Sequence, residues 1–108
     1  MSKVSTINRI KVAKVSDLAV GVGQRVNIAG KEIALFKQND GIIKAILNRC
    51  PHKGGPLSEG IVSGEHVFCP LHDWKINMND GQVQAPDIGC VKTYHVEIMK
   101  DTVFIEIN

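Results

Sequence analysis

Apolar and polar residues alternate with a period of two along several short stretches of this chain. The alternation is clear over residues 10–12, 93–98 and 103–107. This period is typical of a β-strand with one buried face. No window of helical length keeps a 3.6-residue apolar repeat, and at most one helical turn is expected after Ser16. The pattern therefore predicts strands almost throughout.

Turn residues divide these stretches into hairpins. Asn39-Asp40-Gly41 lies between the apolar runs 33–36 and 42–47, and Lys100-Asp101 separates the last two strands. Asn, Asp and Gly tolerate the positive φ angles of tight turns. We therefore expect two hairpins within an all-β fold, a small sandwich or barrel.

Residues 49–90 interrupt this rhythm with many glycines and prolines. They contain all 3 cysteines and three of the 4 histidines of the chain. Two short elements stand out, Cys50-Pro-His52 and Cys69-Pro-Leu-His72, with sixteen residues between His52 and Cys69. The segment between them is long enough to form a short hairpin around Ile61-Val62 and return. The four side chains are therefore expected to converge from two neighbouring loops.

A set of two thiolates and two imidazoles suits zinc, or an iron–sulfur cluster in which two histidines replace two cysteines on one iron. Zinc sites usually pair ligands of one type at each end, whereas each element here is mixed. A mixed pair in each loop favours a binuclear cluster. A zinc ion that only stabilises a small domain is the alternative.

The spacing C-x-H-x₁₆-C-x₂-H resembles that of Rieske [2Fe–2S] proteins. The resemblance implies that Cys50 and Cys69 hold one iron and that His52 and His72 hold the other. It also implies one domain over residues 1–108, with a Rieske-type (ISP-like) β-sandwich or barrel base and a small cluster-binding subdomain at about 49–90. Residues 85–87 resemble the third loop, which covers the cluster in this family.

A finer resemblance is carried by residues 69–74, 79–81 and 90–94, which are similar to the small subunit of assimilatory NAD(P)H-dependent nitrite reductase. It implies a large catalytic subunit with FAD, sirohaem and a [4Fe–4S] cluster that reduces nitrite to ammonium. The present chain then transfers electrons and supplies no catalytic residue. The alternative is a free Rieske ferredoxin that serves an aromatic-ring-hydroxylating dioxygenase.

Two departures from the respiratory Rieske proteins bear on redox potential. Those proteins have an extra disulfide-forming cysteine in each loop, where Gly55 and Leu71 stand here. They also have a serine hydroxyl near a cluster sulfur, where this chain has Trp74. Fewer donors near sulfur destabilise the reduced cluster. We therefore expect a potential near the low end of the Rieske range, about −150 mV.

Composition narrows the functional classes further. The chain has 108 residues, a net charge of +2 and scattered basic residues, which gives no electrostatic case for nucleic-acid binding. Neither a signal peptide nor a membrane span is visible. We expect a cytoplasmic protein that does not bind membranes, and the odd number of cysteines excludes a complete disulfide framework within the chain.

Several other residues have possible structural or functional roles. Cys90 is expected to be a small buried residue, and both His66 and His95 are expected to be solvated. Leu57 and Trp74 either shield the cluster or contact a partner, and Trp74 has a packing role as a further alternative. Three cations, Arg49, Lys53 and Lys75, are either ordinary solvated charges or attract an acidic partner.

Overall fold

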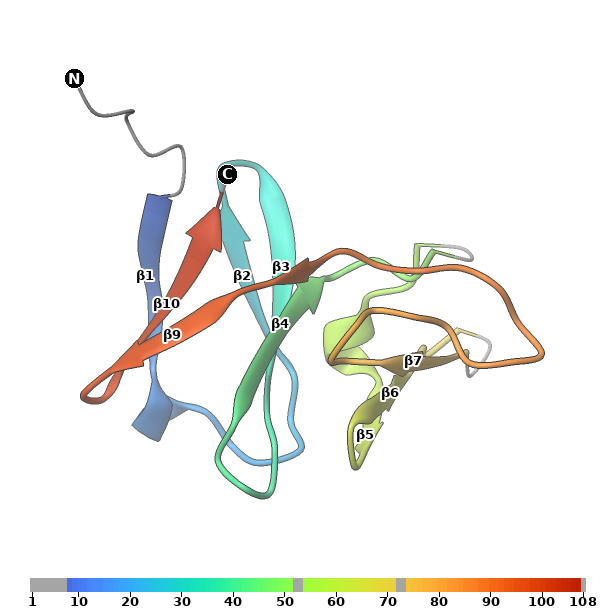
Figure 1. Ribbon diagram of the computed structural model, residues 1–108, viewed down its shortest axis with the longest axis horizontal. Coiled ribbons are helices and arrows are strands. Elements are labelled where there is room, and N and C mark those ends of the chain that lie inside the picture. Colours follow the sequence, from blue (N-terminus) through green and yellow to red (C-terminus); the bar gives the residue numbers. More distant parts are fainter. Residues whose placement is uncertain (1–7, 52–53, 72–73, 108) are drawn as a thin grey trace.

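The computed structural model describes residues 8–51, 54–71 and 74–107 (Figure 1). The all-β prediction is confirmed, because the described residues form antiparallel strands in three small sheets. The first sheet has the order β1-β10-β9, the second β2-β3-β4-β8 and the third β5-β6-β7. Their bounds are β1 Asn8–Lys14, β2 Gln24–Ile28, β3 Lys31–Lys37, β4 Ile43–Leu47, β5 Ile61–Ser63, β6 His66–Phe68, β7 Lys75–Asn77, β8 Thr93–Tyr94, β9 Val96–Met99 and β10 Thr102–Ile107.

Strand β3 is the centre of the fold because both of its faces are buried. Ile33 and Leu35 point into one core, and Ala34 and Phe36 point into another; all four are fully buried. A run of consecutive apolar residues suits a strand covered on both sides. The second sheet is therefore a middle layer between the first sheet and the chain segment 48–91.

The two hydrophobic cores lie on opposite faces of β3. The sandwich core lies between the first and second sheets and comprises Leu18, Ile28, Ile33, Leu35, Ile43, Ala45, Val103 and Ile105. The loop core joins the second sheet to the segment after β4 and comprises Ala34, Phe36, Ile46, Cys50, Leu57, Val67, Cys69, Ile76, Met78, Val83 and Val91. Two of the cysteines thus belong to the loop core.

Both predicted hairpins are present, with one difference in the second. β3 pairs with β4, and β9 pairs with β10 across Lys100-Asp101. Residues 93–98, expected to form one strand, divide at His95: β8 pairs with β4 in the second sheet, whereas β9 pairs with β10 in the first. The chain must cross between the layers of the sandwich here, which a local alternation of residues does not reveal.

Two short 3₁₀ turns also lie in the described residues, η1 (Val15–Asp17) and η2 (Leu57–Glu59). The first is close to the helical turn expected after Ser16, but it begins one residue before Ser16. The second was not predicted, and it buries Leu57 and Ser58 directly after the first cysteine loop. None of the helices in the described ranges has the length and hydropathy of a membrane span.

Candidate metal centre

Two loops begin at Cys50 and Cys69, and each is closed by a backbone hydrogen bond of the same pattern. The amide of Cys50 donates to the carbonyl of Gly55 at 2.9 Å, and the amide of Cys69 donates to the carbonyl of Trp74 at 2.8 Å. Each bond joins a residue to the one five positions later. In the first loop the amide of Gly54 also donates to the carbonyl of Cys50 at 2.9 Å. Each cysteine is therefore anchored at the base of a tight loop.

Gly55 brings the two loops together. A Cβ atom placed on Gly55 would lie 2.9 Å from Cys69 Sγ and 3.0 Å from Leu71 Cγ. The same residue accepts the hydrogen bond from Cys50. The second cysteine thiol therefore rests against the backbone that closes the first loop, and the predicted convergence of the loops is confirmed for their cysteines.

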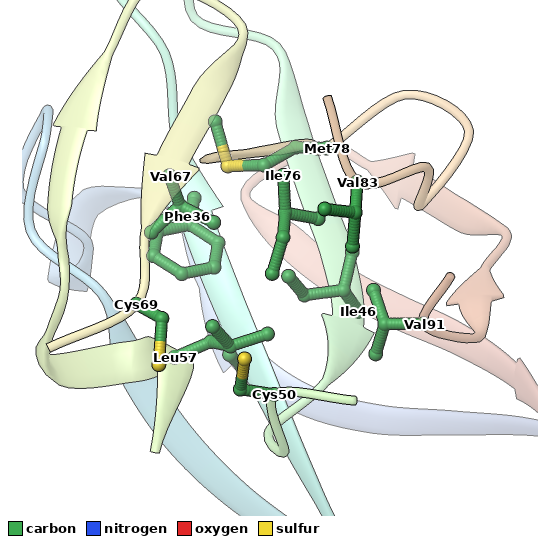
Figure 2. Packing of buried hydrophobic residues seen from close by; sticks show 11 residues of the cluster. Phe36, Ile46, Cys50, Leu57, Val67, Cys69, Ile76, Met78, Val83 and Val91 are labelled. Carbon is green, nitrogen blue, oxygen red and sulfur yellow. The ribbon is translucent and has the colours of Figure 1, made fainter. Parts of the chain in front are cut away.

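Burial sets these two thiols apart from solvent. Cys50 and Cys69 are each 1% exposed and belong to the loop core. In Figure 2 both sulfur atoms lie beside Leu57, at the end of that core away from Met78. Two buried thiols from separate loops thus share one apolar wall.

The hairpin between the loops and the third loop complete the surroundings. β5 and β6 form the hairpin expected around Ile61-Val62. Gly89, which follows the third loop, lies against the first loop, because a Cβ atom there would be 3.4 Å from Pro51 Cγ. The predicted imidazole ligands, His52 and His72, lie outside the described residues.

Comparison with known proteins agrees with this arrangement. The model of the Rieske [2Fe–2S] domain matches residues 8–95. The chain belongs to the Rieske [2Fe–2S] domain family. Its all-β sandwich with a loop segment on one side is the Rieske fold.

The relatives of the chain include dioxygenase ferredoxins, a protein assigned as a nitrite reductase small subunit, and oxygenase components. The chain is 33% identical over 104 residues to the ferredoxin component of the naphthalene 1,2-dioxygenase system of Pseudomonas putida, covering 95% of this chain and 99% of that one. A solved structure assigned as the small subunit of an NADPH nitrite reductase is 28% identical, with a TM-score of 0.81 over 91% of this chain and 97% of that one. The ferredoxin of carbazole 1,9a-dioxygenase from Nocardioides aromaticivorans is 25% identical, with a TM-score of 0.83 over 90% and 95% of the two chains.

The described residues fit a Rieske cluster. Thiolates prefer soft metals and iron–sulfur clusters, and the two thiols are placed together and shielded from water. The positions that carry a disulfide in respiratory Rieske proteins, Gly55 and Leu71, are neighbours here. Their identity excludes that bridge in this chain.

The structure tests the exposure and role predicted for several single residues. Cys90, predicted to be buried, is exposed. That prediction was wrong because the short bridge of Cys90 to Gln82 leaves its side chain at the surface. Leu57 is fully buried in the loop core, which rules out a role as a surface contact, and Trp74 is half-buried and packs against the same core.

The two histidines outside the ligand pattern, His66 and His95, differ in exposure. His66 begins β6 and is half-buried rather than solvated. His95 is exposed, as expected, with its Nε2 atom 3.8 Å from a carboxylate oxygen of Glu106. The pKa of the neighbouring Tyr94 phenol is raised by burial, which disfavours the charged phenolate.

We expect Gly55→Ala to weaken retention of the cluster. The new methyl group would meet Cys69 Sγ at 2.9 Å and Leu71 Cγ at 3.0 Å. Overpacking of this kind costs about 1–3 kcal/mol. Loss of visible absorbance in the presence of an iron chelator should be several times faster than in the wild type.

A second variant separates the two contacts. Leu71 is half-exposed, so Leu71→Ala alone should leave the rate of cluster loss nearly unchanged. The double variant Gly55→Ala/Leu71→Ala should still lose its cluster quickly, because the contact with sulfur remains. Full recovery in the double variant would show that the close approach of Gly55 to the Cys69 sulfur does not limit cluster retention.

Asn48 fixes both ends of the first loop to the second sheet. It is 5% exposed, and its Oδ1 atom accepts the buried amide of Ser58 at 2.7 Å. Its own backbone amide donates to the carbonyl of Glu32 at 2.9 Å. Asn48 therefore holds together the segments before and after the first loop.

Asn48→Ala is expected to lower the free energy of unfolding by about 1–3 kcal/mol, because the buried Ser58 amide loses its acceptor. Denaturant unfolding followed by circular dichroism measures the change. Glu32→Gln changes only the longer contact of the Asn48 side chain, at 3.4 Å, and should lose much less. Equal losses in the two variants would show that the hydrogen bond to Ser58 is not the cause.

Proposed function

We propose that this chain is a one-electron carrier with a Rieske [2Fe–2S] cluster, and that it works with a separate catalytic protein. Family membership and the two buried thiols on matching loops support this proposal. In it, Cys50 and Cys69 ligate one iron and His52 and His72 the other, and residues 49–90 act as the cluster-binding subdomain. The bound cluster would supply one-electron redox chemistry at a low potential.

The chain's own residues have a structural part in this function. The two loop-closing hydrogen bonds hold each cysteine in place before the cofactor binds, and the loop core keeps water from the sulfur atoms. Held ligands and a dry apolar wall are the protein's means of tuning a metal site. Both cysteines also belong to the loop core, which contains Ala34, Phe36 and Ile46 of the second sheet.

The first candidate for the partner is the large subunit of a nitrite reductase. The likeness of residues 69–74 and 90–94 to the small subunits supports it, as does the 28% identical solved structure assigned to such a subunit. FAD, sirohaem and a [4Fe–4S] cluster would reside on that partner, which would reduce nitrite to ammonium with NAD(P)H. Since NAD(P)H is a cytoplasmic reductant, this role places the protein in the cytoplasm.

The second candidate is an aromatic-ring-hydroxylating dioxygenase. It is favoured by the 33% identity to a dioxygenase ferredoxin over nearly the whole length of both chains. Both roles need the same fold, ligands and one-electron chemistry. The partner protein, rather than the site, distinguishes them.

Spectroscopy of the purified full chain tests the proposal itself. We expect two irons per chain and, in the reduced state, an EPR signal whose average g value is lower than that of an all-cysteine [2Fe–2S] centre. A colourless protein that retains zinc after anaerobic purification would overturn it. Anaerobic handling matters because cluster loss in air would give the same lack of colour.

Copurification then separates the two partners. The chain should be expressed from its own host with an affinity tag and isolated under mild conditions. A sirohaem-containing protein that reduces nitrite in the complex supports the first candidate, and an oxygenase component supports the second. Neither protein in the complex would argue against both roles.

A further inference from the structure

A groove opens beside the first loop, next to one of the two buried thiols. Its cavity has a volume of about 330 Å³ and is lined by Arg49, Cys50, Cys90 and Lys92, among others. Arg49 and Cys90 are exposed, as is Lys92, whereas Cys50 belongs to the loop core. A molecule in this groove would therefore lie next to the proposed ligand Cys50.

The two cations of the groove have no acidic partner among the described residues. The Arg and Lys ion pairs of the described residues lie elsewhere, on the first sheet, where Arg9 pairs with both Glu97 and Glu106. No described carboxylate lies within ion-pairing distance of Arg49 or Lys92. The positive charge of the groove is therefore not neutralised by the part of the chain that the structure describes.

Both side chains rest against the protein surface. The Arg49 guanidinium lies over the first loop, because a Cβ atom on Gly54 would be 3.2 Å from Arg49 Cζ. The Lys92 ammonium lies 5.2 Å from the centre of the Tyr94 ring, within the range of a cation–π contact. Contacts of this kind restrict the side chains and keep the two charges beside the first loop.

An adjoining cavity extends the same surface. It has a volume of about 400 Å³, shares Arg49 and adds Lys31 and Glu32. The Glu32 carboxylate accepts a hydrogen bond from the Asn48 side chain at 3.4 Å. Three cations and one acid thus line the two cavities, which together form an open surface rather than an enclosed pocket.

We propose that this groove docks a carboxylate-bearing surface of the redox partner, with Arg49 and Lys92 as its contacts. The proposal rests on the proposed function, because it concerns the protein that exchanges electrons with this chain. Opposite charges on two surfaces accelerate their encounter and fix their orientation. An extended acidic surface suits two adjoining open cavities better than a small anion does.

Cys90 provides a built-in reporter for the groove, since it is exposed there whereas the other two cysteines are buried. In the holoprotein, its reaction rate is measured with dianionic DTNB and with neutral iodoacetamide. The thiolate is the nucleophile toward both reagents, so the ratio of the two rates cancels the thiolate fraction and reports the local potential. Mass spectrometry and a Cys90→Ser variant confirm the site of labelling.

In Arg49→Gln/Lys92→Gln, this ratio should fall about fivefold at an ionic strength of about 0.01 M and much less at high salt. The matched control is Lys11→Gln/Lys14→Gln, which removes the same charge from exposed positions on β1. It should leave the ratio nearly unchanged. Equal changes in both double variants, or no change in either, would overturn the proposal.

A hexaglutamate peptide tests the occupant. It should protect Cys90 of the wild type from iodoacetamide at low salt, and it should not protect the groove variant. Free glutamate at the same carboxylate concentration should protect poorly; equal protection would mean a site for small anions and would overturn docking of an acidic surface. Spectra of the same samples report the cluster, so a failure of the proposed function is seen independently of the thiol rates.

Discussion

Cys50→Ser is expected to abolish the visible spectrum of the protein and to reduce its iron content from two atoms per chain to nearly none. Cys50 is 1% exposed at the base of the first loop, so a serine hydroxyl fits the space but is a poor ligand for iron. Iron analysis and absorption of the anaerobically purified variant measure the effect. In a complex with the catalytic partner, electron transfer should fall to background.

Cys90→Ser is the matched control for this experiment. Cys90 is exposed and lies outside the ligand pattern, so its replacement should leave the spectrum and iron content unchanged. A Cys50→Ser variant that keeps both irons and an unchanged EPR signal would refute the assignment of Cys50. Unchanged nitrite reduction by a complex whose variant subunit has lost its iron would argue instead that the cluster does not relay electrons.

The second large effect concerns the reduction potential, for which we expect about −150 mV rather than about +300 mV. Hydrogen bonds to sulfur stabilise the reduced, more negative cluster and raise the potential. Here the amides of Cys50, Gly54 and Cys69 donate to backbone carbonyls. They are therefore not available to the sulfur atoms in this arrangement.

Redox titration of the full chain, followed by EPR or visible absorption, measures this potential. A midpoint above zero would contradict the prediction. Trp74→Ser provides the matched test, since it introduces a hydroxyl where the respiratory proteins have one. We expect the potential of this variant to rise, and iron content serves as its control for cluster retention.

Much of the fold was predictable because its signals are local. Apolar runs on both sides of a turn of Asn, Asp and Gly predict β3, β4 and the hairpin between them. A two-residue alternation on both sides of Lys100-Asp101 predicts β9, β10 and the second hairpin. The division at His95 was not predictable. It depends on which layer of the sandwich accepts each half of the strand, and the residues themselves are equally suited to either.

For the candidate site, the spacing of Cys50 and Cys69 was sufficient to predict that two loops meet. The wrong prediction for Cys90 has the opposite lesson. A small apolar residue beside the buried Val91 looks like core in the sequence, yet neighbouring residues of an extended chain face opposite sides. Its exposure was decided by the way residues 82 and 90 pair, which is a contact between distant positions.

By itself, the sequence determined the strand pattern, the two cysteine loops and the family, because these depend on residue type and short spacing. Only the tertiary structure decided that Gly55 lies against the Cys69 sulfur, that Asn48 joins both ends of the first loop, and that Arg49 and Lys92 flank one groove. Such contacts join residues far apart in the chain. Their formation depends on how the two cores pack around β3, and no local pattern encodes that packing.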